Sequence, residues 1–297
     1  ELVDRKAAEI KPADLRPVLA RLVDAKKGRT AGKARSYLHA AYAAAIRADF
    51  DPDAPEALCG FQIESNPVSV MPSMAHHNRA GQRVLNEPEL RAYMARLSQR
   101  SLMTRLALEL DLMLGGQRPT QLLRAQASDV DVTSSPGEIV LLDLKGARRQ
   151  PRVHVLPLIG RAREIVAEAL SINPTGPLFS NMAGDDGKPI ALRMDTLSAA
   201  VTDMAKAMVA AGEARSSFSM RDIRRTCETQ LAALSVSKDI RGQLLSHGLG
   251  GLQDKHYDRH GYWTEKIKAL RAWEKRLKTV AEGGRATVTS IKRAVRA

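Results

Sequence analysis

The sequence has few cysteines and no long apolar run, and both absences limit what kind of protein it encodes. Its 297 residues include only Cys59 and Cys227, which provide neither a disulfide framework nor the spacing of a metal site. A reducing environment is therefore expected. No apolar run approaches the ~18 residues of a membrane span, and no signal peptide is visible. The chain begins with Glu1 rather than Met, so we expect a further N-terminal region before it.

Acidic residues are also few relative to basic ones. Lys and Arg number 46 against 33 Asp and Glu, which gives a net charge of +13 and a pI near 10.0. About half of this excess lies in the segment from Thr264 onward. The excess predicts a polyanionic partner, most often nucleic acid, and the alternative is a merely soluble basic surface.

The pattern of apolar residues predicts a mainly α-helical protein with a small antiparallel β-sheet, that is, an α+β fold. The length suits two domains. We expect a helical domain over 1–74, a linker over 75–85, a second domain over 86–280 and a basic tail over 281–297. The linker is indicated by its Gly and polar residues.

Within the second domain, helical periodicity alternates with one strand pair. We expect helices near 87–98, 102–113, 160–171 and 193–211, and strands over 138–144 and 152–157. Asn86 and Glu89 form a capping pattern for the first helix, and Thr264 is expected to cap a final one. That final helix docks either on a neighbouring protomer or on its own domain, and the sequence leaves both open.

The most informative stretch runs from Met220 to Tyr262. A helix there has apolar residues on one face, namely Ile223, Cys227, Leu231 and Leu234. Arg224 lies beside that face, and an arginine at the edge of a core is costly unless an anion meets it. His247 follows a second short helix, where Gly248 can supply a left-handed turn. Tyr257 comes ten residues after His247.

These motifs resemble those of the tyrosine recombinase (phage integrase) family. The family pattern is His-x-x-Arg-(Arg)-Thr, then Leu-(Gly/Ser/Ala)-His, then a tyrosine nine or ten residues later. The matching residues are Arg224-Arg225-Thr226, Leu245-Ser246-His247 and Tyr257, whereas Arg221 stands where the family has the first His. The run from Tyr257 to His260 is most similar to integrases of satellite phages and genomic islands.

The resemblance implies a catalytic role for each matching residue. The implied set is Arg118, Lys145, Arg221, Arg224, His247 and Tyr257. Arg118 belongs to a Gly-x-Arg motif just before Pro119, and a phosphate accounts for an arginine at that helix mouth. Planar guanidinium groups match phosphate, a flexible lysine can protonate a leaving oxygen, and a phenol is a suitable nucleophile.

Further basic residues are expected to contact the DNA backbone, because Lys and Arg on phosphates release counterions. They are Lys26, Lys27, Arg29, Lys33, Arg35, Arg148, Arg149, Arg152 and Arg225. For the five basic residues between positions 26 and 35, the alternative is a solvated loop followed by a helix face. For the basic residues around Lys145, the alternative is an ordinary hairpin tip without a DNA contact. By resemblance, 1–74 is a core-binding domain that clamps one side of the duplex.

The resemblance thus implies a site-specific DNA recombinase, an integrase of a mobile element. It would cleave double-stranded DNA through a 3′-phosphotyrosyl intermediate without ATP, metal or other cofactor. A homotetramer on DNA, DNA-bending accessory proteins and a bacterial, nucleoid-associated cytoplasmic location are implied as well. The alternatives are a type IB topoisomerase-like enzyme and a non-catalytic DNA-binding descendant. Arg221 fits a natural variant, a slowed enzyme or an inactive one, since arginine is no base near neutral pH.

Overall fold

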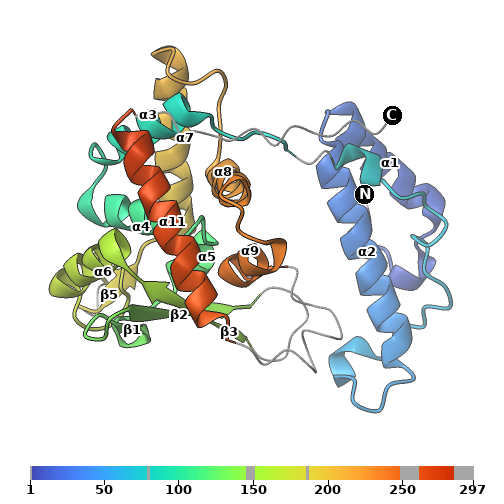
Figure 1. The fold of residues 1–297 in the computed structure, drawn as a ribbon. Helices are drawn as coiled ribbons and strands as arrows, with labels where there is room; N and C mark the ends of the chain where they lie inside the picture. Colours follow the sequence, from blue (N-terminus) through green and yellow to red (C-terminus); the bar gives the residue numbers. More distant parts are fainter. Residues whose placement is uncertain (1, 79–80, 145–150, 185–186, 248–260, 284–297) are drawn as a thin grey trace, which may run out of the picture. The chain divides into compact units, whose positions relative to one another are not determined.

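The computed structural model describes the chain except for residues 1, 79–80, 145–150, 185–186, 248–260 and 284–297 (Figure 1). Internal contacts divide it into two units, Glu1–Gly81 and Gln82–Ala297. The division lies between Gly81 and Gln82, and the finer boundaries expected from the sequence stay predictions. The predicted fold class is confirmed, because the described residues form mainly helices with two small antiparallel sheets.

The first unit is built on two helices, α1 (Pro12–Asp24) and α2 (Gly28–Ala48), which pack against each other. A 3-10 turn, η1 (Ala7–Glu9), precedes them. Helix α1 begins at Pro12, and the Asp14 carboxylate accepts the backbone N–H of Lys11 at 2.8 Å. The small core of this unit comprises Leu15, Tyr42, Ile63 and Val68.

Residues 49–74 differ from the expectation of helix throughout the first unit. They contain only one 3-10 turn, η2 (Glu56–Leu58), so that expectation is wrong for this stretch. Prolines recur through it, and a proline lacks the backbone N–H that an interior helical position requires. These prolines are Pro52, Pro55, Pro67 and Pro72. The helical character of the unit therefore rests on α1 and α2.

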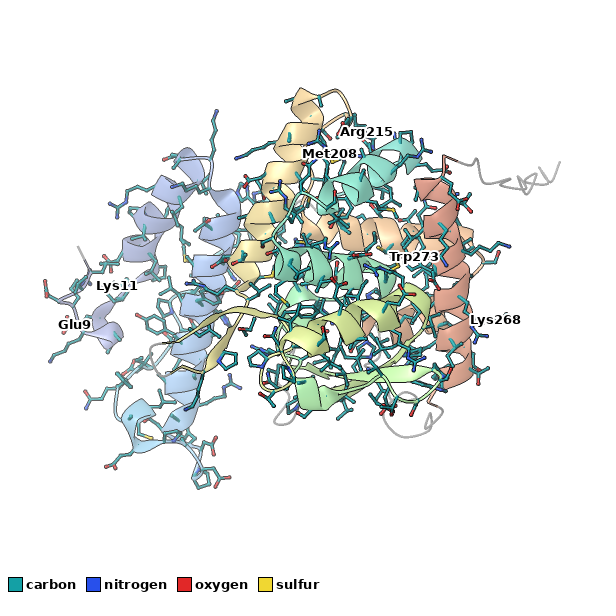
Figure 2. All side chains as sticks on the ribbon, turned by 90° about the vertical axis from the view of Figure 1, so that its left-hand side faces the viewer. Glu9, Lys11, Met208, Arg215, Lys268 and Trp273 are labelled. Carbon is teal, nitrogen blue, oxygen red and sulfur yellow. The ribbon has the colours of Figure 1, made fainter. Side chains whose placement is uncertain are left out.

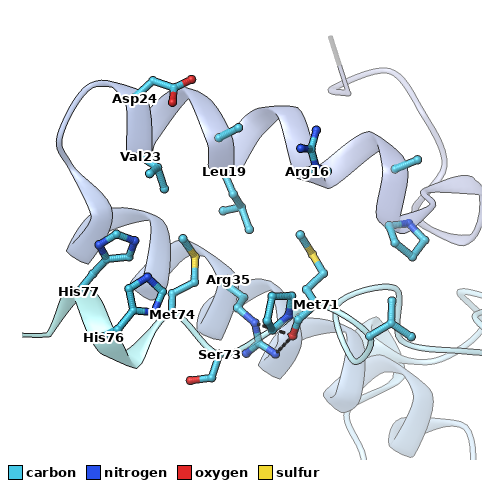
Figure 3. Close-up of a pocket in the computed structure, with 15 residues that line it drawn as sticks. Arg16, Leu19, Val23, Asp24, Arg35, Met71, Ser73, Met74, His76 and His77 are labelled. Atoms are coloured by element: carbon cyan, nitrogen blue, oxygen red, sulfur yellow. Dashed lines mark hydrogen bonds between the residues drawn. The ribbon is translucent and has the colours of Figure 1, made fainter.

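A groove of about 600 Å³ lies between α1 and the segment 70–77 (Figure 3). The segment is held on α2 because Arg35 donates from Nε to the carbonyl of Met71 at 3.2 Å. It ends in a 3-10 turn, η3 (Ala75–His77). The His77 ring packs so closely on Gly28 that a Cβ there would lie 2.4 Å from Nδ1.

The second unit carries the remaining elements. Its helices are α3 (Glu87–Leu97), α4 (Leu102–Met113), α5 (Pro119–Leu122), α6 (Gly160–Ile172), α7 (Met194–Ala210), α8 (Met220–Ala233), α9 (Lys238–Leu245) and α11 (Trp263–Ala281). Its strands are β1 (Val130–Asp131), β2 (Gly137–Asp143), β3 (Arg152–Leu158), β4 (Ser180–Ala183) and β5 (Pro189–Ala191), and η4 (Ala127–Asp129) precedes β1. The predicted helices and both predicted strands are confirmed to within two residues.

The larger sheet is antiparallel, with the order β1-β2-β3. In the antiparallel register of β2 and β3, Val140 is paired with Val155. Along β2, buried residues alternate with more exposed ones, as expected for a strand with one face on the core. Asp143 ends that strand on the buried face. The β4–β5 pair forms a second sheet that the sequence analysis did not predict.

Helix α4 lies at the centre of the second unit and contacts α3, α5, α6, α7, α8 and α11. Most of its leucines are therefore buried, and Leu106, Leu108, Leu110 and Leu112 are each 0% exposed, whereas Leu102 at its start is exposed. Trp273 of α11 is also fully buried, and its Nε1 donates to the carbonyl of Leu112 at 2.7 Å (Figure 2). Helix α11 thus docks on its own domain.

Two predicted helix starts had different outcomes. Asn86 accepts the N–H of Glu89 and donates its own N–H to the Glu89 carboxylate, each at 2.9 Å, so the predicted capping box of α3 is confirmed. Thr264 does not cap α11. That helix begins at Trp263, after Tyr262 in a left-handed conformation (φ 52°), so the cap prediction is wrong.

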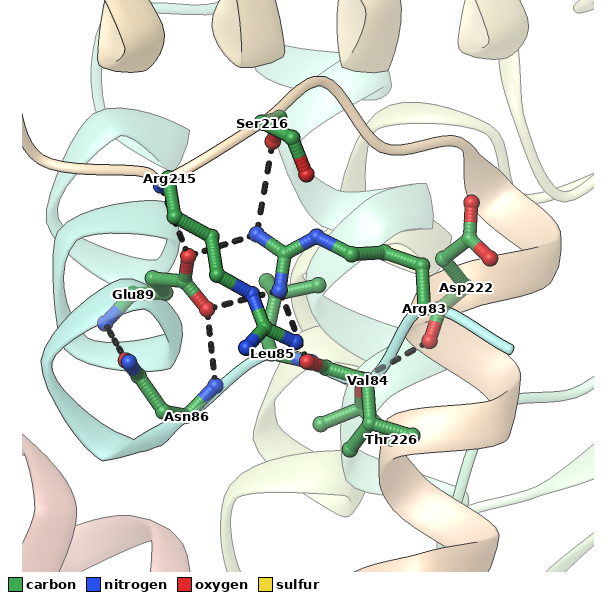
Figure 4. A network of polar contacts seen from close by, with 9 residues as sticks. All are labelled: Arg83, Val84, Leu85, Asn86, Glu89, Arg215, Ser216, Asp222 and Thr226. Atoms are coloured by element: carbon green, nitrogen blue, oxygen red, sulfur yellow. Dashed lines mark hydrogen bonds and ion pairs between the residues drawn. The ribbon is translucent and has the colours of Figure 1, made fainter. Parts of the chain in front are cut away.

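Glu89 also anchors the start of the second unit (Figure 4). Its carboxylate accepts two bonds from Arg83, at 2.5 and 2.9 Å, and one from the N–H of Arg215 at 2.9 Å. Burial favours the neutral acid, but Arg83 and the N–H groups of Arg215 and Asn86 outweigh it and lower the pKa of Glu89 to about 2. A buried carboxylate with every lone pair engaged is expected to stabilise the fold.

We expect Glu89→Gln to lower the free energy of unfolding by about 3 kcal/mol at pH 7, because it leaves the Arg83 charge unpaired. The folded-state pKa of Glu89 lies below its usual value of 4.5, so its stabilisation is complete above that pH and declines as pH falls toward 2. Urea unfolding across pH 2.5–7 measures the difference. Exposed Glu138→Gln is the matched control, and equal losses for both variants would contradict the prediction.

Candidate active site

Three consecutive carbonyls at the end of α9 collect side chains from distant parts of the second unit. The Leu244 carbonyl accepts Nε2 of Gln117 at 2.9 Å and faces Nε2 of His154 at 3.1 Å. The Leu245 carbonyl accepts Nη2 of Arg224 at 2.7 Å. The final carbonyls of a helix have no partner within the helix, so these side chains satisfy them. His247 follows directly after this group.

Arg118 completes the group. Its Nη1 donates to the Ser246 carbonyl at 3.2 Å and lies 3.4 Å from Oδ2 of Asp143. Arg118 occupies the position before α5, as predicted, with Pro119 in the first turn. Arg118 and Arg224, which are 106 positions apart in the printed sequence, therefore bind successive carbonyls of one helix end. The structure brings together both predicted arginines and His247.

Gly116 allows Arg224 to reach this position. Its N–H donates to the carbonyl of Asp111 at 2.7 Å, and its own carbonyl accepts Nη1 of Arg224 at 2.7 Å. Its φ is +85°, and a Cβ at this position would lie 2.7 Å from the Cα of Arg224. Only glycine combines this backbone conformation with such a close approach to α8.

The residue before His247 has a left-handed backbone. Ser246 has φ 48° and ψ 48°, and Gly248, the glycine expected to supply a left-handed turn, lies outside the described residues. The Ser246 hydroxyl donates to Oδ2 of Asp143 at 2.8 Å, and this bond holds the serine in place. Nε2 of His247 lies 3.4 Å from Oε1 of Glu228, which is one turn beyond Arg224 on α8.

Asp143 is a site residue that the sequence analysis missed. It is 2% exposed, ends β2, and meets both Ser246 and Arg118. It precedes Lys145 by two positions, so the strand that leads to the predicted lysine is tied to the arginine group. The signal was its place on the buried face of β2, where a charged residue requires a partner.

Two side chains of the site, Arg224 and His154, differ in charge although burial acts on both. Burial lowers the pKa of Arg224 to about 10, and repulsion from Arg118 acts in the same direction, while Asp111 and Glu228 oppose it. Arg224 therefore remains cationic at neutral pH. Burial also lowers the pKa of His154 to about 3, so its imidazole is neutral. Because a carbonyl only accepts, Nε2 of His154 carries the proton in its contact with Leu244.

Two other predicted residues of α8 lie apart from this group. Arg221 is exposed, and it forms no hydrogen bond or ion pair with the described part of the chain. Arg225 donates to the carbonyl of Arg83 at 3.0 Å and pairs with Asp222, so its guanidinium holds the start of the second unit. DNA contact by Arg225 stays a prediction.

The remaining predicted residues fall into two groups. Lys145, Arg148, Arg149 and Tyr257 lie outside the described residues. In the first unit, exposed side chains belong to Lys26, Lys27, Arg29 and Lys33, whereas Arg35 is partly buried on the Met71 carbonyl. Arg152 is partly buried on β3. Their contacts to DNA stay predictions.

Among the described residues, no group of three or more His, Cys, Asp or Glu side chains is arranged to hold a metal ion. None of the helices in the same ranges combines the length and apolar character needed to cross a lipid bilayer.

The fold is shared with solved structures of DNA-bound integrases and site-specific recombinases. One is a lambda integrase (75-356) dimer bound to a COC′ core site, with a TM-score of 0.57 and 19% identity over 87% of this chain and 85% of that chain. A second is XerH site-specific recombinase bound to a palindromic difH substrate, with a TM-score of 0.55 and 17% identity over 93% and 73%.

A third similar structure is a lambda integrase tetramer bound to a Holliday junction, with a TM-score of 0.55 and 19% identity over 85% of this chain and 67% of that chain. No protein-family model matches the sequence, and no curated protein matches it. The fold of the chain is therefore that of the tyrosine recombinases, the family that its motifs resemble.

We expect Gly116→Ala to lower the free energy of unfolding by about 3 kcal/mol. A left-handed alanine costs about 1–2 kcal/mol, and the Cβ additionally pushes against the backbone of Arg224. Gly212→Ala is the matched control, because Gly212 also has positive φ (+70°) but nothing lies within 4 Å of its Cβ position. Urea unfolding compares the two. Equal losses would show that the approach to Arg224 carries no cost.

Proposed function

We propose that the chain is a site-specific DNA recombinase that breaks and rejoins DNA through Tyr257. The observation that carries the proposal is the convergence of Arg118, Arg224 and His247 at the end of α9, in a fold shared with DNA-bound recombinases. The sequence motifs support the same reading, since Tyr257 follows His247 at the spacing of the family.

The two arginines are suited to a phosphodiester. Negative charge builds on the non-bridging oxygens when a nucleophile attacks phosphorus, and fixed positive charge stabilises that state. Arg118 and Arg224 are held through backbone carbonyls, so they need little reorganisation when a phosphate binds. His247, beside Glu228, adds a further hydrogen-bond donor.

In the proposed reaction, the Tyr257 phenol oxygen attacks phosphorus and the bond to the 5′ oxygen breaks. The products are a 3′-phosphotyrosyl enzyme and a free 5′-hydroxyl, with Lys145 supplying the proton to that hydroxyl. The bond from phosphorus to Tyr257 replaces the broken ester bond and conserves its energy, so rejoining requires neither ATP nor a metal. Attack by the 5′-hydroxyl of a partner strand completes strand exchange.

The arginine at position 221 supports a second candidate function, that of a DNA-binding protein that kept the fold and lost catalysis. Arginine cannot accept the phenol proton near neutral pH. We prefer the enzyme because the other five residues of the implied set are present. Arg221 is exposed on α8 three residues before Arg224, where it can contact a phosphate, and His256 or water would accept the proton.

The assembly is part of the proposal. Lambda integrase forms a dimer on a core site and a tetramer on a Holliday junction in the similar structures. We expect this chain to act as a homotetramer on two DNA duplexes, with DNA-bending accessory proteins. Its role would be integration or excision of a mobile element at the nucleoid of a bacterial cell.

We expect Tyr257→Phe to abolish covalent attachment to DNA, because the nucleophilic oxygen is lost. The protein is incubated with nicked duplexes from the ends of its mobile element and denatured in SDS, and a protein–DNA band is sought. Tyr262→Phe is the control, since Tyr262 lies nearby without the family spacing and should keep the band.

Arg221→His is tested in the same assay. We expect a protein–DNA band from both the wild type and this variant. Their cleavage rates should differ by less than tenfold, which corresponds to about 1.4 kcal/mol in the activation free energy. A band that appears only after Arg221→His would identify an inactivated recombinase. DNA binding without a band from any variant would favour the binding-only protein.

We expect Lys33→Gln to make the salt dependence of DNA binding shallower by about 0.9 in the log–log slope, because one phosphate contact is lost. Arg35→Gln is the contrast. Its guanidinium donates to the Met71 carbonyl at 3.2 and 2.5 Å, so this change should also lower the free energy of unfolding, which Lys33→Gln should leave unchanged because Lys33 is exposed. Fluorescence anisotropy from 50 to 300 mM salt measures both. Identical slopes for Lys33→Gln and wild type would remove Lys33 from the interface.

A further inference from the structure

A buried carboxyl group lies close enough to Arg224 for their charges to interact. Asp111 of α4 is 1% exposed, and neither of its carboxylate oxygens has a hydrogen-bond partner in the described part of the chain. The hydroxyl of Tyr93 on α3 is likewise buried and unpartnered there. A buried carboxylate without hydrogen bonds is costly, whereas the neutral acid costs far less. The surroundings of Asp111 therefore favour its protonated form.

Asp111 is connected to Arg224 by a short path. Its backbone carbonyl accepts the N–H of Gly116 at 2.7 Å, and the Gly116 carbonyl accepts Nη1 of Arg224 at 2.7 Å. The two side chains also influence each other through charge, because Arg224 favours the ionised form of Asp111 and Asp111 favours the cationic form of Arg224. Arg224 is thus the group through which Asp111 can affect a bound phosphate.

This inference rests on the proposed function and concerns the same site. We propose that Asp111 is a positioning residue that acts through Arg224. Neutral Asp111 leaves the full charge of Arg224 to the scissile phosphate, and ionised Asp111 offsets that charge and slows DNA cleavage. A phosphate that arrives beside Arg224 adds negative charge to the site, which favours the neutral form of Asp111 further. DNA binding is therefore accompanied by proton uptake.

The balance between the two forms lies near physiological pH. Burial raises the pKa of Asp111 to about 8, against the opposing charge of Arg224 and the nearby N–H of Gln117. Tyr93 and Cys227 also face this carboxyl, and burial raises the pKa of each well above its ordinary range, so both stay neutral. Of these groups, Asp111 is the one expected to change charge between pH 7 and 9.

Other charged groups on the elements around α4 are engaged elsewhere or exposed. Glu109 and Arg105 of α4 pair with Arg161 and Glu168 of α6. Asp203 and Lys206 of α7 are exposed. Helix α11 meets α4 through the Trp273 indole, and its Arg276 pairs with Glu87 of α3. Helix α5 contributes the uncharged side chain of Gln121. Arg118, which precedes α5, donates to the Ser246 carbonyl.

The test compares the full-length wild type with Asp111→Asn from pH 6.5 to 9. Two quantities are measured: the cleavage rate constant on nicked duplexes and the association constant for intact duplexes by fluorescence anisotropy. We expect the variant-to-wild-type ratio of each to be near 1 at pH 6.5 and to rise through pH 9 toward a limit of about 10, the effect of one pKa unit of coupling. Exposed Asp203→Asn is the control and should give a flat ratio.

Asp111→Leu separates ionisation from shape, because it removes the charge without supplying an amide. It should reproduce the pH-dependent ratio, even where melting temperatures show that it is less stable than Asp111→Asn. A purely structural role for Asp111 would change the ratio by the same factor at every pH. A flat ratio in both measurements, with folded variants, would overturn the proposal.

The two proposals fail in distinguishable ways. If the wild type binds DNA but forms no covalent complex at any pH tested, the recombinase function is refuted. The association constants alone would then test the role of Asp111. Arg224→Gln, introduced both into the wild type and into the Asp111→Asn variant, should flatten the ratio of association constants. A pH-dependent ratio that survives Arg224→Gln would show that Asp111 does not act through Arg224.

Discussion

The second unit depends on the capping of one helix end. The last carbonyls of α9 have no partners inside the helix, and buried carbonyls must be satisfied. Gln117, Arg118, His154 and Arg224 satisfy them from three places in the chain. A requirement of the backbone therefore fixes the arrangement of two arginines beside His247. The same hydrogen bonds that stabilise the fold prepare a site for an anion.

Helix α4 sets the electrostatic character of that site. Most of its residues are buried, which suits its leucines, and it also holds one buried carboxyl group at Asp111, whose charge interacts with that of Arg224. The glycines that end α4 bring the backbone close enough to α8 for Arg224 to bond with the Gly116 carbonyl. Burial thus acts twice, since it weakens the ionisation of Asp111 and keeps Arg224 in a region of low dielectric.

Much of the local structure could be predicted because it depends on near neighbours in the sequence. The Asn86–Glu89 capping box, α4, and the buried face of α8 at Ile223 and Cys227 follow from spacing alone. The failures have equally physical causes. Prolines interrupt residues 49–74, and α11 begins at Trp263, after Tyr262 in a left-handed conformation, so Thr264 lies inside the helix and does not cap it.

By itself, the sequence determined the mainly helical class, the basic character, the position of Arg118 before Pro119, and the motif that contains Arg224 and His247. Those features arise from composition and short spacings. Only the tertiary structure decided that Asp143 and Asp111 belong beside these residues, and that α11 packs on its own domain. Partners that lie far apart in the chain meet only when the core forms, and the desolvation that shifts their pKa values exists only there.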